Sequence, residues 1–85
     1  MNQKPVTIYT TKTCGYCRAT KDLFKEHSIA FSEIDVTTDT VKQREMIEKS
    51  GQMGVPVTVI GQGSEEEIII GYDRNSFGRA LNLAL

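Results

Sequence analysis

The chain has 85 residues, which is the length of one small domain spanning residues 1–85. Hydrophobic residues make up 39% of it, charged residues 25%, and the formal net charge is -1, which argues against a disordered chain and against nucleic-acid binding. The longest apolar run, Ile68–Ile70, is far shorter than the roughly 20 residues of a membrane span, and no hydrophobic leader opens the sequence, so we expect a cytoplasmic protein without a membrane partner.

The first third of the chain predicts a strand, a helix and a second strand. Val6–Thr10 is rich in β-branched and aromatic residues, which favours a strand, and a short polar loop follows it. From Gly15 to about Ser28 the apolar residues recur at helical spacing. Phe31–Val36 alternates well enough to predict the second strand. The apolar stripe of the helix comprises Ala19, Leu23, Phe24 and His27.

A second helix is predicted after Thr37–Asp39, which carries helix-start residues. Val41, Met46 and Ile47 mark its apolar face. Gly51 fits the left-handed position that commonly follows a helix end.

The remaining residues predict a hairpin and a last helix. Two strands are predicted, at Val57–Ile60 and Glu67–Ile70, and a turn at Gly61–Ser64 joins them. We expect Glu65–Glu67 to form a solvated tip of this hairpin. Asp73 can cap a helix that runs to about Leu83.

The order β-α-β-α-β-β-α predicts an α/β domain of the thioredoxin-like fold. Its first crossover is long enough to join two parallel strands with the usual right hand, whereas the short hairpin joins antiparallel strands. A four-stranded mixed sheet between helices results. Cys14 then lies where the first strand meets the first helix.

Both cysteines of the chain lie in one motif, Cys14-Gly15-Tyr16-Cys17. Structural disulfides are rare in the cytosol, and a Cys-x-x-Cys beside a βαβ pattern indicates a redox pair. A zinc site needs about four ligands, whereas the single histidine, His27, lies ten residues beyond Cys17. We therefore predict a dithiol redox site and no metal.

The helix start explains why Cys14 is the predicted nucleophile. Unpaired backbone N–H groups and the positive end of the helix dipole favour the thiolate there, and Lys12, Arg18 and Lys21 add positive charge. Cys17 lies one turn further in, within disulfide distance and less exposed. We assign Cys17 as the resolving thiol.

Three further features of the sequence each allow two interpretations. A cis Val55-Pro56 bond would free the Val55 backbone to pair with an extended substrate, although the residues alone favour a trans bond that opens a strand. Backbone N–H groups at Gly71-Tyr72-Asp73 could hold a carboxylate, or Asp73 is simply an N-cap. Tyr16 either packs over a bound thiol or covers the sheet edge.

Over essentially its whole length the chain resembles the glutaredoxin family, and most closely its small bacterial glutaredoxin-like and NrdH-redoxin-like members. The resemblance implies a cis Val55-Pro56 bond and a monomeric oxidoreductase for glutathione mixed disulfides or protein disulfides. It implies no tightly bound cofactor, with glutathione as co-substrate. The motifs that carry it are Ile8-Tyr9-Thr10, Thr13 to Cys17, Arg44 to Ile47, Gly54-Val55-Pro56 and Gly71-Tyr72-Asp73. The substrate-binding or glutathione-binding positions it implies are Lys12, Tyr16, Val55, Pro56, Gly71, Tyr72 and Asp73.

The chain also departs from the family pattern. The usual Gly-Gly-x-Asp-Asp corner reads Ile70 to Arg74 here, and Gly54 replaces a common threonine. The basic residue three positions before the nucleophile is Thr11, with Lys12 displaced by one. Redoxins reduced by thioredoxin reductase show such losses too, so that reductase is a second candidate electron donor. Gly15, in place of the usual proline, leaves an alternative class open, a dimer that carries a [2Fe–2S] cluster with the help of glutathione.

Overall fold

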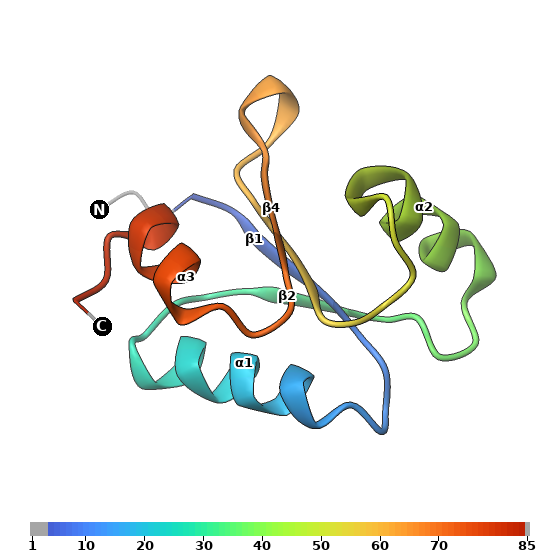
Figure 1. The fold of residues 1–85 in the computed structure, drawn as a ribbon, viewed down its shortest axis with the longest axis horizontal. Helices are drawn as coiled ribbons and strands as arrows, with labels where there is room; N and C mark the ends of the chain where they lie inside the picture. The colour runs from blue at the N-terminus through green and yellow to red at the C-terminus, as the bar shows by residue number, and fades with distance from the viewer. Residues whose placement is uncertain (1–3, 85) are drawn as a thin grey trace.

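The computed structural model describes residues 4–84 and contains every strand and helix that the sequence predicts, in the same order (Figure 1). Two helices end earlier than expected, because Ser28 and Asn82 adopt left-handed backbone conformations beyond their last turns. The elements are β1 (Val6–Thr10), α1 (Gly15–Glu26), β2 (Ser32–Asp35), α2 (Thr40–Ser50), β3 (Val57–Ile60), a 3₁₀ turn (Gly63–Glu65), β4 (Glu67–Ile70) and α3 (Arg74–Leu81).

The four strands form one mixed sheet in the order β2-β1-β3-β4. β1 is parallel to β2 and antiparallel to β3, and β3 is antiparallel to β4. Tyr9 pairs with Ile34 on one side and Val57 on the other, and Val57 pairs in turn with Ile70. The predicted mixed sheet is confirmed.

Helices cover both faces of the sheet, with α1 and α3 together on one side and α2 on the other (Figure 1). On the first face Phe24 of α1 meets Phe77 of α3 edge-on, with ring centroids 5.2 Å apart. On the second face Met46 of α2 packs on Tyr9 and Val57. No helix within residues 4–84 is long and apolar enough to cross a bilayer.

Two of the predicted helix faces need correction. Val41 is 74% exposed, because five residues at about 100° each rotate it far from buried Met46. In α1 the buried stripe includes Cys17 and Thr20, whereas Ala19 and His27 are only partly buried. Thr20 tolerates burial because its hydroxyl donates a hydrogen bond to the Tyr16 carbonyl at 2.9 Å.

The tip of the β3–β4 hairpin is also less solvated than predicted. Glu66 is half-buried, and both its carboxylate oxygens accept hydrogen bonds from Lys49 at 2.9 Å. The hairpin is thereby tied to the last turn of α2, which precedes the loop leading into β3.

Candidate functional site

Cys14 is the N-cap of α1, with extended backbone angles that let its side chain turn back over the helix start. The Cys17 N–H donates to the Cys14 sulfur at 3.0 Å, and the Arg18 N–H donates to the Cys14 carbonyl at 3.3 Å. The first turn of the helix carries no acidic residue. An otherwise unpaired backbone N–H therefore faces the sulfur, which favours its ionised form.

Cys14 and Cys17 form a disulfide, with their Cα atoms 5.2 Å apart. Cys17 is only 1% exposed, whereas Cys14 is half-buried. An incoming substrate can thus reach the sulfur of Cys14 more readily than that of Cys17. This placement agrees with the predicted roles of nucleophile and resolving thiol, which themselves stay predictions.

Positive charge gathers on one side of Cys14. Lys12 and Arg18, together with Thr13 and Gly15, line a surface pocket of about 280 Å³ beside the cysteine. The Lys12 N–H donates to the Thr37 hydroxyl at 3.1 Å, which ties this loop to the end of β2.

Lys21, which the sequence also placed among the charges around Cys14, is already paired. Its ammonium lies 2.9 Å from the Glu33 carboxylate. This hydrogen bond, followed by one from the Thr10 hydroxyl, lowers the pKa of Glu33. Lys21 therefore contributes less positive charge to the site than its position in the sequence suggested.

The Val55-Pro56 peptide bond is cis, as the family resemblance implied and contrary to the trans bond that the residues alone favoured. The Pro56 carbonyl accepts a hydrogen bond from the Gly71 N–H at 2.9 Å, which joins this loop to the corner before α3. Gln52 braces the approach to the bond through hydrogen bonds to both backbone groups of Gly54. Within residues 4–84 the backbone of Val55 forms no hydrogen bond, so it is available to a ligand strand.

At the corner before α3, Asp73 is the helix N-cap. Its carboxylate accepts the Ser76 N–H at 3.1 Å and the Ser76 hydroxyl at 2.9 Å, and the backbone bond is the main reason that the pKa of Asp73 is lowered. The Arg74 guanidinium donates to the Tyr72 hydroxyl at 3.1 Å. Gly71 has a φ of 81°, which favours glycine there. The N-cap reading is confirmed, and a ligand carboxylate would have to share this helix start with Asp73.

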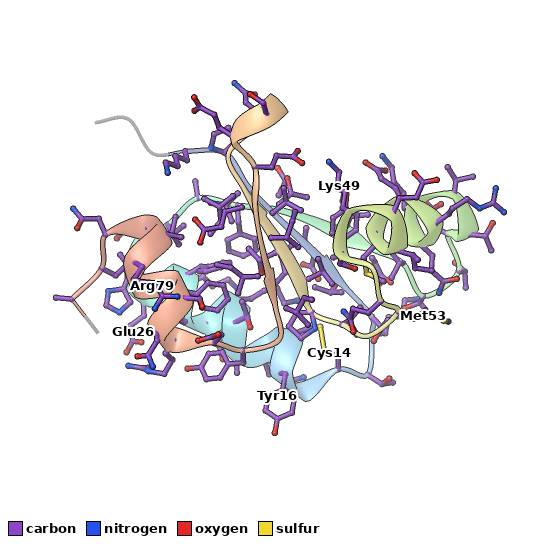
Figure 2. The ribbon with its side chains drawn as sticks, turned by 45° about the horizontal axis from the view of Figure 1, so that its top comes forward. Cys14, Tyr16, Glu26, Lys49, Met53 and Arg79 are labelled. Carbon is purple, nitrogen blue, oxygen red and sulfur yellow. A yellow bond between two sulfur atoms is a disulfide. The ribbon has the colours of Figure 1, made fainter. Side chains whose placement is uncertain are left out.

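Two large apolar side chains, one in the first turn of α1 and one in the loop before β3, are exposed. Tyr16 and Met53 are each 69% exposed, and in Figure 2 Cys14 lies between them along one margin of the domain. Tyr16 points away from the body of the domain, so it is free to contact a substrate. Met53 is not among the site residues predicted from the sequence. Its one signal is a large apolar residue in a loop, two positions before the Val55-Pro56 bond.

Residues 6–64 match the sequence model of the glutaredoxin family. The chain belongs to the glutaredoxin family. An uncharacterized glutaredoxin-like 8.6 kDa protein in the rubredoxin operon of Clostridium pasteurianum is 36% identical over 69 residues, 81% of this chain and 87% of the relative. The glutaredoxin-like protein NrdH of Lactococcus lactis subsp. cremoris is 39% identical over 49 residues, 58% of this chain and 62% of the relative.

Solved structures place this member of the glutaredoxin family in the thioredoxin-like fold. The NrdH-redoxin of Escherichia coli, described as glutaredoxin-like with a thioredoxin-like activity profile, superimposes with a TM-score of 0.72 and 25% identity. The match covers 88% of this chain and 92% of that one. The family match, the relatives and the Cys14–Cys17 pair agree. The chain is a redox protein of the glutaredoxin family, in the general class of thiol-disulfide oxidoreductases.

Proposed function

We propose that this glutaredoxin reduces disulfides through its dithiol, with Cys14 as the nucleophile and Cys17 as the resolving thiol. The observation that carries the proposal is the Cys14 sulfur at the N-cap of α1, where it accepts the Cys17 N–H at 3.0 Å. That contact stabilises negative charge on sulfur, both when Cys14 attacks and when it leaves. A better leaving group speeds re-reduction of the protein, when the second thiol of the electron donor displaces Cys14 from the mixed disulfide that it forms with the donor.

The reaction balances as two successive exchanges. The Cys14 thiolate attacks one sulfur of the substrate disulfide, forms a mixed disulfide and expels the other substrate sulfur, which takes up a proton. Cys17 then loses its proton and attacks the Cys14 sulfur, which releases the second substrate thiol. The substrate gains two electrons and two protons, and the protein ends in the disulfide state.

Protein disulfides are the proposed main substrate, with thioredoxin reductase as the proposed electron donor and glutathione as the competing one. Arg74 stands where the family usually has its second aspartate, and its guanidinium bonds to the Tyr72 hydroxyl. Asp73 already uses the Ser76 N–H at the start of α3. Both features weaken the corner as a glutathione site, and the thioredoxin-like activity profile of the Escherichia coli NrdH-redoxin supports the same assignment.

The test is NADPH consumption in two coupled assays, one with glutathione and glutathione reductase and one with thioredoxin reductase. We expect Cys14→Ser to lose all measurable activity in both. Cys17→Ser should still reduce a glutathione mixed disulfide, which needs only one protein thiol, but should lose most of its activity on a protein disulfide. Ser64→Ala, an exposed change in the hairpin turn, is the control.

Three results would contradict the proposal at different points. Full activity of Cys14→Ser would remove the assigned nucleophile. Faster turnover with glutathione than with thioredoxin reductase would reverse the assignment of the donor. A brown dimer with visible absorption after anaerobic purification, inactive on disulfides, would favour the alternative of a [2Fe–2S] carrier.

A further inference from the structure

Lys12 and Arg18 are two exposed cations beside the Cys14 sulfur that form no ion pair within residues 4–84. They line the same pocket as Cys14, and no carboxylate lines it with them. By contrast, Lys21, Lys42 and Lys49 are each paired with a glutamate of this chain.

Asp35 does not neutralise Lys12. Asp35 lies within electrostatic reach of Lys12, but its carboxylate is hydrogen-bonded to the Thr37 N–H at 2.8 Å. In the described part of the chain Asp35 and Lys12 form no ion pair. The pocket therefore keeps a positive field that an anionic group of a ligand can meet.

The exposed apolar side chains of Tyr16 and Met53 indicate how long that ligand is. Tyr16 and Met53 come from α1 and from the loop before β3, and Cys14 lies between them (Figure 2). The backbone of Val55 is free to pair with an extended chain, whose side chains would alternate between opposite directions about every 3.3 Å. Neither Tyr16 nor Met53 lines the pocket, so a small anion bound in it would leave both side chains without a partner on the ligand.

We propose that the preferred substrate is a disulfide in an extended, acidic protein segment. Apolar side chains of that segment contact Tyr16 and Met53, and an acidic side chain close to its reacting cysteine pairs with Lys12 and Arg18. The inference rests on the proposed function, since the segment is reduced by the same two exchanges at Cys14 and Cys17. Because Lys12 and Arg18 are exposed, their main effect is on the association rate, and salt screens it.

The experiment is single-turnover reduction of synthetic peptides by the pre-reduced, full-length protein in excess, which needs no electron donor. Three peptides of equal length carry one disulfide each, flanked by glutamates, glutamines or lysines. At low salt we expect the glutamate peptide to react about three- to tenfold faster than the glutamine peptide, since each exposed ion pair contributes a factor of up to about five. The lysine peptide should be slowest, and the differences should shrink toward one at about 0.5 M salt.

Variants test the assigned residues through the ratio of rates on the glutamate and glutamine peptides. The double variant Lys12→Gln, Arg18→Gln should bring the ratio to about one, whereas Arg18→Lys, which keeps the charge, should preserve it. Lys25→Gln, which removes one positive charge at the other end of α1, is the control and should also preserve it. Met53→Ser should slow all three peptides relative to the small neutral hydroxyethyl disulfide.

Failure of this inference can be distinguished from failure of the proposed function. Equal rates on the three peptides at low salt, or an unchanged ratio in the double variant, would overturn the acidic-segment proposal and leave dithiol chemistry intact. Faster reduction of glutathione disulfide than of any peptide would overturn it in favour of a small anionic substrate. No reduction of any disulfide by the wild-type protein would overturn the proposed function itself.

Discussion

Thr58 is the buried side chain of residues 4–84 whose hydroxyl lacks a hydrogen-bond partner. Two other buried threonines are satisfied, since Thr10 donates to Glu33 at 2.7 Å and Thr20 donates to the Tyr16 carbonyl. A buried hydroxyl that has given up its bonds to water without replacement lowers stability. In the middle of β3, Thr58 therefore acts as a β-branched filler rather than as a polar contact.

Thr58→Val should raise the free energy of unfolding by about 1 kcal/mol, because valine keeps the shape and removes the unpaired hydroxyl. Urea denaturation of the oxidised protein measures the change. Thr20→Val is the matched comparison and should lower stability, since the Tyr16 carbonyl loses a donor. A clear loss of stability in Thr58→Val would show that its hydroxyl is bonded after all.

At the scale of elements, Glu33 joins two strands and a helix. Its carboxylate in β2 accepts the Thr10 hydroxyl from β1 at 2.7 Å and the Lys21 ammonium from α1 at 2.9 Å. The second such tie is Lys49 to Glu66, between α2 and the hairpin. Each tie connects residues far apart in sequence, which is why the charge pattern did not reveal them.

The lowered pKa of Glu33 makes the free energy of unfolding depend on pH in a definite direction. The hydrogen bond from Lys21 is the main cause, so the folded state holds the carboxylate ionised to lower pH than the unfolded state does. The stability that the ionised Glu33 adds is present above the pKa of Glu33 in the unfolded chain, and it is lost as pH falls through the lower pKa of Glu33 in the folded protein.

Glu33→Gln should therefore be less stable than the wild type at pH 7, by under about 1 kcal/mol because the pair is partly solvated. The difference should narrow below about pH 4. Urea denaturation at pH 7, 5 and 3.5 measures it, with Glu48→Gln as an exposed control. A difference that stays constant over this range would contradict the assigned cause.

Across the whole molecule, stability depends on two separate cores, one on each face of the sheet. The core under α1 and α3 is closed by Phe77, which is fully buried against Phe24. Because α3 is only eight residues long, its position depends on this packing rather than on its own helix propensity. The corner at Gly71 and Asp73 is held by the same helix.

Phe77→Ala should lower the free energy of unfolding by about 3–5 kcal/mol, which is a large share of what a small domain has. Thermal unfolding followed by circular dichroism measures the loss. Val41→Ala, on the exposed face of α2, should change stability by less than about 0.5 kcal/mol. A comparable loss in both variants would mean that α2 buries Val41 against the sheet.

The sequence by itself determined the order of elements and the position of Cys14 at a helix start, because strand alternation, helix periodicity and caps act over a few neighbouring residues. The tertiary structure decided the exposure of Met53 and the pairing that removes Lys21 from the site, and it confirmed the cis bond before Pro56 that only the family resemblance had implied. These features arise where segments distant in the chain meet. The energies of such contacts are set by packing and charge in three dimensions, which no local pattern encodes.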